Sequence, residues 1–226
     1  DQVLEQHLEN FNPHFPGVRS FSEKLKACRA FADRVIHDNI DLNKYAACSS
    51  GHQILADIVR DYHTYLKDSQ LVDFALLEDM LLTRLKSGRV TTTTHKLKAL
   101  LVDEFQDTNY LQEQIYYELC RRSGATLTVV GDDDQSIFRF RGATVEIFAD
   151  FANRLSNSLG PSWKPRRIDL TDNYRSTERI VSFCTHFISS EPDFQTARAP
   201  GKQACRWMGY RPKHKHTRPR FVSQRP

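Results

Sequence analysis

Three groups of polar residues in this chain have side chains suited to work on a phosphorylated substrate, and each follows a short apolar segment. A carboxylate at the end of a strand can hold Mg²⁺, because this ion prefers hard oxygen ligands. A neighbouring carboxylate can orient or deprotonate a water that attacks a phosphoryl group, and an arginine can neutralise the charge that develops there. The groups are Asp103-Glu104 after Ala99–Val102, Gly131–Gln135 after Leu127–Val130, and Tyr174-Arg175 after Ile168–Leu170.

Each group, taken alone, also has an ordinary structural interpretation. Asp103-Glu104 is typical of an acidic strand end or a helix cap as well, and Tyr174-Arg175 of a buried tyrosine beside a surface arginine. The three adjacent aspartates of the second group favour an acidic loop and disfavour a phosphate cradle. Gln135 differs from them, since a neutral amide can donate to a phosphate or a water without adding charge.

An aromatic and basic segment, Phe138-Arg139-Phe140-Arg141, follows the second group. If the segment is extended, alternate side chains lie on opposite faces, with both phenylalanines on one face and both arginines on the other. Aromatic rings can then stack on bases while arginines hold phosphates, and such stacking contributes about 1–3 kcal/mol per base. Two core phenylalanines with solvated arginines are the alternative.

The elements that position these groups alternate between short apolar segments and helices. Asn109 and Gln112 predict the cap of a helix between the first two segments, and residues 144–155 predict another helix. This alternation favours a mainly parallel α/β sheet, in which ligands bind beyond the carboxyl ends of the strands. All three groups fall at such ends, so we expect one site there.

Residues 1–88 are predicted to be helical. Ser20 with Glu23 predicts a capping box. Three apolar stripes at helical spacing are predicted to form core. They are Phe21, Leu25, Cys28, Phe31, Ala32 and Val35; Ile54, Leu55, Ile58, Val59, Tyr62 and Leu66; and Phe74, Leu77, Met80, Leu81 and Leu85, closed by Ser87-Gly88.

Composition and charge exclude several classes of protein. Of 226 residues, 39% are hydrophobic, which excludes a wholly disordered chain. No apolar run approaches the roughly 20 residues of a membrane span, and the amino end does not resemble a secretory signal. The five cysteines form no CxxC pair, which fits a reducing compartment and predicts a soluble, cytoplasmic protein.

The net charge of +4 is unevenly distributed. Residues 194–226 hold nine Lys/Arg and no Asp or Glu, whereas residues 1–193 hold 23 basic and 28 acidic side chains. The basic tail fits a disordered nucleic-acid-binding arm, a segment read from a shifted frame or the consequence of a truncation. His214 and His216 within it are expected to be solvated.

Together the three groups resemble a known family. Val102–Thr108, Gly131–Ala143 and Asn173–Ser176 are similar, in order and spacing, to motifs II, III and IV of the superfamily 1 DNA helicases of the UvrD/Rep/PcrA type. Val72-Asp73-Phe74 resembles the segment that precedes motif II, and residues 197–202 faintly resemble the segment after motif IV. The resemblance covers roughly residues 70–202.

This resemblance implies an α/β fold of the P-loop NTPase superfamily, with a partial RecA-like parallel sheet core (1A) and an all-helical inserted subdomain (1B). The implied domains are 1B over residues 1–88, 1A over 89–178, the start of 2A over 179–202, and a basic tail, expected to be disordered, over 203–226.

The resemblance also implies ATP and Mg²⁺ as cofactors and single-stranded or tailed DNA as partner. Asp103 is expected to hold Mg²⁺, Glu104 to activate the hydrolytic water, Gln135 and Arg175 to sense the γ-phosphate, and Tyr174 to stack on adenine. The expected DNA contacts are Phe138, Phe140 and Arg141. The implied activity is ATP hydrolysis coupled to translocation, typically 3′ to 5′, and to duplex unwinding, with DNA repair among the processes served.

One expected motif is absent from these 226 residues. A Walker A loop needs G-x-x-x-x-G-K-[ST], and Gly201-Lys202, the only Gly-Lys here, is followed by Gln203. We therefore expect a helicase fragment with weak or lost nucleotide binding, which needs further helicase segments or a partner subunit for activity. Two alternatives are a non-catalytic single-stranded-DNA-binding remnant and a metal-dependent nuclease built from Asp103, Asp107 and residues 132–134.

Overall fold

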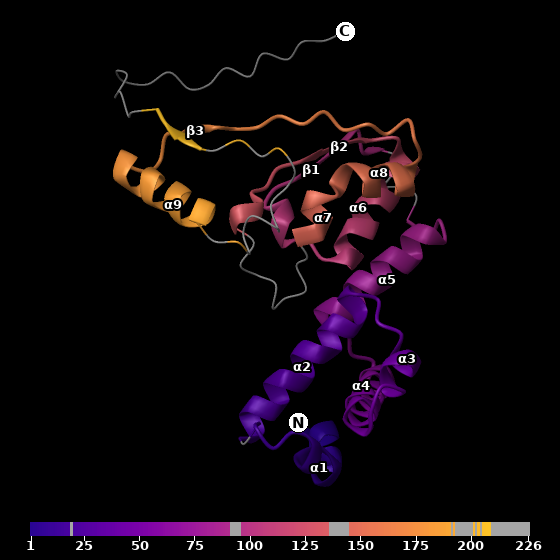
Figure 1. The fold of residues 1–226 in the computed structure, drawn as a ribbon. Helices are drawn as coiled ribbons and strands as arrows, with labels where there is room; N and C mark the ends of the chain where they lie inside the picture. Colours follow the sequence, from indigo (N-terminus) through magenta and orange to yellow (C-terminus); the bar gives the residue numbers. More distant parts are fainter. Residues whose placement is uncertain are drawn as a thin grey trace, which may run out of the picture. The chain divides into compact units, whose positions relative to one another are not determined.

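The computed structural model describes residues 1–18, 20–90, 96–135, 145–190, 192, 201, 203 and 205–208, without the side chains of Val145, Glu146 and Trp207. The chain is divided into two units, which are described separately. The larger lies within Asp1–Arg166, and the smaller begins at Arg167 (Figure 1).

The amino-terminal part of the larger unit is helical, as predicted. Ser20 Oγ accepts a hydrogen bond from Glu23 N at 3.2 Å, and Glu23 Oε2 accepts one from Ser20 N at 3.1 Å. This confirms the capping box, which fixes where the second helix begins. The helices are α1 (Gln2–His14), α2 (Phe21–His37), α3 (Leu42–Ala46), α4 (Ser50–Asp68) and α5 (Phe74–Lys86).

Buried apolar side chains hold α1, α2 and α4 together. Phe11, Cys28 and Ile58, one from each helix, belong to one cluster and are at most 6% exposed. Burying a side chain of this kind contributes about 1.5–3 kcal/mol. Burial also raises the pKa of the Cys28 thiol to about 11, so this cysteine acts as a core residue and not as a nucleophile. The first two predicted stripes therefore contribute to the core.

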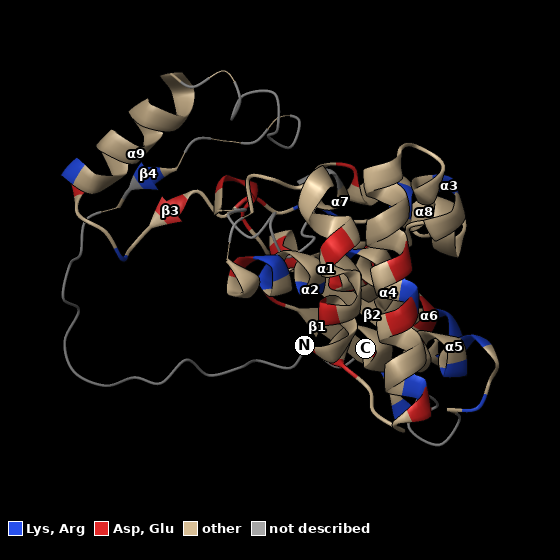
Figure 2. Cartoon of the chain, turned by 90° about the horizontal axis from the view of Figure 1, so that it is seen from below, with Lys and Arg blue, Asp and Glu red and all other residues tan. Residues whose placement is uncertain are grey.

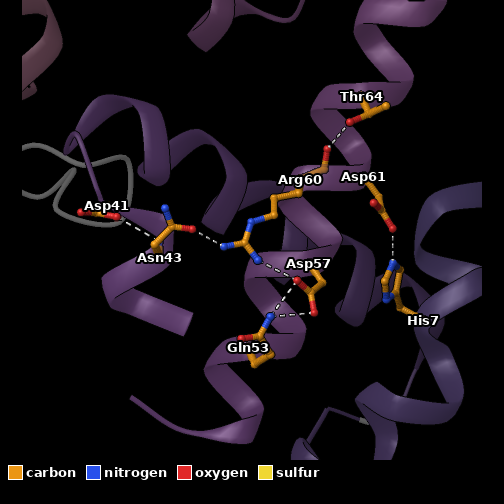
Figure 3. Close-up of polar contacts among 8 residues, drawn as sticks. All are labelled: His7, Asp41, Asn43, Gln53, Asp57, Arg60, Asp61 and Thr64. Atoms are coloured by element: carbon orange, nitrogen blue, oxygen red, sulfur yellow. Dashed lines mark hydrogen bonds and ion pairs between the residues drawn. The ribbon is translucent and has the colours of Figure 1, made fainter. Parts of the chain in front are cut away.

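Polar contacts also join α4 to α1 and to α3 (Figure 3). His7 Nε2 on α1 lies 2.8 Å from Asp61 Oδ2 on α4. Arg60 of α4 donates to Asp57 at 2.7 Å and to Asn43 of α3 at 2.8 Å. Exposed pairs of this kind contribute about 0–1 kcal/mol each, so packing and not charge holds this part together.

The stripe predicted on α5 is only partly correct. Leu85 is fully buried, but Phe74 is 88% exposed and Leu77 is 52% exposed. The helix instead packs through Leu82 and Leu85 against the helix that follows the first strand, and Ala75 is also buried. Apolar residues surround much of α5, so periodicity alone does not decide which face the neighbouring helix covers.

A small parallel sheet follows. Strands β1 (Ala99–Val102) and β2 (Thr126–Val129) pair in parallel, with Ala99 opposite Thr126 and Val102 opposite Val129. Helix α6 (Tyr110–Ser123) connects them, as parallel pairing requires a crossover. The predicted Asn109–Gln112 capping box is present at its start, and Gly124, at φ 68°, ends it. The larger unit is thus a helix-rich α/β structure.

A buried ion pair joins α6 to α8 (Phe151–Leu159), which follows α7 (Val145–Ala149). Glu113 of α6 is 0% exposed, and its carboxylate accepts hydrogen bonds from both Nε (2.7 Å) and a terminal nitrogen of Arg154. Tyr117 Oη donates to the same carboxylate at 2.8 Å. The guanidinium also lies 4.8 Å from the centre of the Tyr110 ring. A buried charge with this many partners fixes the mutual orientation of the two helices.

The smaller unit contains α9 (Glu178–Ser190) and a short parallel pair, β3 (Asp172–Asn173) with β4 (Arg206–Trp207). In Figure 2 the acidic colour on β3 lies beside the basic colour on β4. The strand predicted at Ile168–Leu170 is wrong, since these residues are irregular and Ile168 is 68% exposed. Pairing with β4 starts only beyond them, where Arg206 N donates to Thr171 O at 2.8 Å. None of the described helices is long and apolar enough to cross a membrane.

Candidate functional site

The carboxyl ends of β1 and β2 bring the first two predicted groups together. Val130 N donates to Val102 O at 2.8 Å, which extends the pairing beyond the strands. Phe105 N then donates back to Val130 O at 2.9 Å. The segment containing Asp103 and Glu104 therefore lies beside the segment that begins at Gly131. This is the edge at which parallel sheets bind ligands.

Asp103 and Glu104 present two exposed carboxylates at this edge. Glu104 has φ 50°, a left-handed conformation that costs a non-glycine residue about 1–2 kcal/mol. Glu104 N donates to Asp103 Oδ1 at 2.9 Å, and the 3₁₀ turn η2 (Phe105–Asp107) follows directly. The surrounding contacts thus hold a strained residue at the point where the chain leaves the strand, as is typical of functional sites.

A buried aromatic cluster supports this turn. Phe105 is 1% exposed, and its ring centre lies 5.2 Å from that of Phe151, 6.3 Å from that of Phe148 and 6.4 Å from that of Tyr116. Burial raises the pKa of the Tyr116 hydroxyl, which remains protonated as part of this cluster. The side chain that follows Glu104 is therefore anchored against α6, α7 and α8, which restricts the carboxylates to the solvent side.

Gln106 connects the two segments through its side chain. It is 2% exposed. Its Nε2 donates to Glu104 Oε2 at 2.6 Å, and its Oε1 accepts from Asp132 N at 3.0 Å. One amide group thus contacts both the carboxylate after β1 and the backbone after β2.

The segment after β2 is organised around Asp132. Its carboxylate accepts from Gln135 Nε2 at 2.7 Å and from Asp134 N at 3.2 Å, within the 3₁₀ turn η3 (Asp133–Gln135). Glu104, Gln106, Asp132 and Gln135 consequently form a continuous chain of hydrogen bonds. The predicted residues Glu104 and Gln135 lie at its two ends.

Gly131 allows the two segments to approach this closely. A Cβ atom built there lies 2.6 Å from Gln106 Oε1 and 2.8 Å from Phe148 Cε2. Both distances are too short for any side chain, so the position requires glycine for lack of space and not for its backbone angles.

The donor set at this edge fits a hard divalent cation. The carboxylate of Asp103 is exposed, and those of Asp132, Asp133 and Asp134 offer oxygens within 4.8 Å of one another. Mg²⁺ is commonly held by one or two carboxylates together with waters and substrate phosphates. Asp103, at the strand end, is suited to be such a ligand.

Tyr174 and Arg175 belong to the smaller unit, where only their local geometry is described. Asn173 Oδ1 accepts from Arg175 N at 3.0 Å and from Ser176 N at 2.9 Å, which forms a tight turn after β3. Both side chains are exposed, and Tyr174 Oη donates to Asp172 Oδ2 at 3.3 Å. The hydrogen bond from Arg206 holds the pKa of the Asp172 carboxyl below its usual value. Phe138, Phe140 and Arg141 lie outside the described residues.

Sequence reasoning missed the role of Gln106 and of Asp132 as a connector. The unusual continuation Phe105–Thr108 after the acidic pair was the available signal. It did not reveal that the glutamine bridges two segments 26 positions apart.

The family model described as UvrD/REP helicase N-terminal domain matches residues 3–156. The chain belongs to this family. The match covers the helical part, the acidic strand end and the Asp132 segment, and the structure agrees with a helix-rich α/β member that has a small parallel sheet.

Curated relatives of this UvrD/REP family chain are named as DNA helicases or as components of a helicase/nuclease. The ATP-dependent DNA helicase Rep of Buchnera aphidicola is 35% identical over 59% of this chain, and the ATP-dependent DNA helicase PcrA of Bacillus subtilis is 34% identical over 61%. An ATP-dependent helicase/nuclease subunit of Carboxydothermus hydrogenoformans is 35% identical over 72%. The chain spans 19%, 18% and 12% of the lengths of these three relatives.

Proposed function

We propose that this chain is part of an ATP-dependent DNA helicase and carries the Mg²⁺-nucleotide edge of its motor core. The observation that carries the proposal is the exposed Asp103-Glu104 pair at the end of β1, joined by hydrogen bonds to the loop of Gln135. Family membership and the names of the relatives support it. The finer fold assignment is part of the same proposal: residues 1–88 as the inserted 1B subdomain, 89–178 as part of a RecA-like 1A core of the P-loop NTPase superfamily, 179–202 as the start of 2A and 203–226 as a basic tail.

Asp103 holds the ion, directly or through water, in the proposed reaction. Mg²⁺ held there would supply positive charge that offsets the negative charge developing during phosphoryl transfer. Glu104 accepts a proton from the attacking water or orients it, because its carboxylate is exposed and fixed on one side by Gln106. Gln135 donates its amide hydrogens to the γ-phosphate or to the water.

The remaining roles rest on the sequence motifs. Tyr174 stacks on the adenine, and Arg175 contacts the γ-phosphate. Phe138, Phe140 and Arg141 bind single-stranded DNA, so that hydrolysis drives translocation in the 3′ to 5′ direction. No Walker A sequence occurs in these 226 residues, and we therefore expect weak nucleotide binding and little ATP turnover by this chain without further helicase segments or a partner subunit.

Two binding measurements on the purified chain test the proposal. Fluorescence anisotropy of a labelled ATP analogue with Mg²⁺ is expected to rise with protein concentration, and Asp103→Ala is expected to weaken that binding. Asp61→Ala removes an exposed carboxylate of α4 and serves as the matched control. Equal binding by both variants contradicts the assignment of Asp103.

A labelled single-stranded oligonucleotide is measured in parallel. Binding is expected to weaken as salt rises, because phosphate contacts release counterions. DNA binding with no nucleotide binding, even at high protein concentration, favours the alternative of a non-catalytic single-stranded-DNA-binding remnant. Absence of both contradicts a helicase role for the chain.

A further inference from the structure

We propose that Gln106 is a positioning residue that holds the Glu104 carboxylate and couples it to the loop carrying Gln135. The inference rests on the proposed function, because it assigns Gln106 a task in the site where Glu104 activates water. It adds a residue whose contacts come from the structure and to which the sequence motifs gave no role.

The donor end of the amide fixes Glu104. Gln106 Nε2 lies 2.6 Å from Glu104 Oε2, and a hydrogen bond to a charged acceptor is about twice as strong as one between neutral groups. Glu104 is otherwise an exposed side chain. Holding one oxygen leaves the other, Oε1, to accept a hydrogen bond from the attacking water.

The acceptor end fixes the amide itself. Gln106 Oε1 receives the N–H of Asp132 at 3.0 Å, and the side chain is 2% exposed. Turning the amide over would place its oxygen against the Glu104 carboxylate and its NH₂ against the Asp132 N–H. Both new contacts are repulsive, so the two partners together select one orientation.

Coupling follows from the contacts of Asp132. Its carboxylate holds the Gln135 side chain at 2.7 Å, so a change in the contacts of Gln135 displaces Asp132. The Asp132 N–H then moves relative to Gln106 Oε1, and the amide transmits the change to Glu104. The bare backbone of Gly131 keeps Gln106 in direct contact with this loop.

The coupling is tested by nuclear magnetic resonance on the nucleotide-free chain, with the Glu104 side-chain carboxyl carbon as the reporter. Gln135→Ala is expected to shift this signal in the wild-type background and to leave it unchanged in a Gln106→Met background. Methionine is unbranched and similar in length, but it has no amide. The same shift in both backgrounds, or no shift in either, overturns the proposal.

Hydrogen exchange at the Asp132 amide separates the two ends of the side chain. Gln106→Met is expected to speed exchange about tenfold, the loss expected for one good hydrogen bond. Gln106→Glu keeps an acceptor for Asp132 N–H but repels Glu104, so it is expected to preserve the slow exchange while shifting the Glu104 signal. Slow exchange in Gln106→Met contradicts the acceptor contact, and an unshifted Glu104 signal in Gln106→Glu contradicts the donor contact.

Gln53→Met is the matched control. Gln53 Nε2 donates to both Asp57 oxygens at 2.9 Å on α4 (Figure 3), so the variant removes the same kind of amide–carboxylate contact away from the site. It is expected to leave the Glu104 and Asp132 signals unchanged. These readouts need no nucleotide. If Gln135→Ala leaves the Glu104 signal unshifted in the wild-type background while nucleotide still binds, the role of Gln106 alone is refuted. If the coupling is present but nucleotide does not bind, the proposed function alone is refuted.

Discussion

Gln106 and Asp132 are joined across the edge of the sheet by a hydrogen bond of 3.0 Å from the Asp132 backbone N–H to the Gln106 side-chain oxygen. The contact links the turn after β1 to the turn after β2. Because Gln106 also donates to Glu104, the exposed carboxylate is not independent of the neighbouring loop. A change in either turn is therefore expected to be measurable in the other.

Gly131→Ala is expected to separate the two turns. The new methyl group lies within 3.0 Å of both Gln106 Oε1 and Phe148 Cε2, and forcing an extra carbon into a packed site costs about 1–3 kcal/mol. Urea unfolding measures the loss. Gly17→Ala is the control, because a Cβ there meets no atom within 4 Å. Equal stability of the two variants contradicts the close approach at Gly131.

Leu85→Ala is expected to destabilise the contact between α5 and α6. Leu85 is 0% exposed and packs in a cluster with Leu111 and Ile115, and truncation of such a leucine costs about 2–5 kcal/mol. Leu77→Ala, at a position that is 52% exposed on the same helix, is expected to change stability by about 0.5 kcal/mol or less. A larger loss at Leu77 than at Leu85 means that the packed face of α5 is assigned wrongly.

Arg154→Met tests the buried pair between α6 and α8. The variant leaves Glu113 buried without its cation, which typically costs about 3–5 kcal/mol. Arg60→Met removes the exposed partner of Asp57 and is expected to cost about 1 kcal/mol or less. Chemical denaturation of both variants provides the comparison. If the two variants lose similar amounts of unfolding free energy, the buried Glu113 carboxylate does not need Arg154 to offset its charge.

The pair of His37 and Glu78 predicts a pH dependence of stability. The Glu78 carboxylate, whose Oε2 lies 3.5 Å from His37 Nε2, raises the pKa of His37 above its ordinary value of 6.5. Protonated His37 therefore contributes to the free energy of unfolding. This contribution is fully present below about pH 6.5 and is lost as the pH rises through the pKa of His37 in the folded protein. Burial lowers the pKa of His63, so the effect of this histidine on the free energy of unfolding has the opposite dependence on pH.

The prediction accordingly concerns a difference between proteins. The stability gap between wild type and His37→Gln is expected to be larger in mildly acidic solution than in alkaline solution, as followed by urea unfolding over a pH series. Glu78→Gln removes the partner and is expected to abolish the dependence of this gap on pH. A stability difference between wild type and His37→Gln that grows with rising pH contradicts a raised pKa at His37.

Local features of the fold were predictable from the sequence, because they depend on neighbours in the chain. The capping boxes at Ser20 and Asn109 need only residues three positions apart, and both are present. The strand that precedes Asp103 was recognisable from four apolar residues followed directly by charge. The edge position of Asp103 and Glu104 then followed from parallel strand pairing.

Features that depend on tertiary contacts were not predictable. The exposed Phe74 and the buried Leu85 belong to one apolar helix, and only the position of α6 distinguishes them. The strand expected at Ile168–Leu170 lies further along the chain because its partner pairs there. The bridge formed by Gln106 depends on the close approach of Gly131, which no sequence pattern reports.

The most direct test of the central claim is paramagnetic line broadening by Mn²⁺ and ATP added together, since Mn²⁺ replaces Mg²⁺ at oxygen-ligand sites. The amide signals of Asp103, Glu104, Asp132 and Gln135 are expected to broaden first, and Asp103→Asn is expected to abolish the effect. Broadening confined to other parts of the chain, or unchanged in Asp103→Asn, would contradict a Mg²⁺-nucleotide site at the ends of β1 and β2.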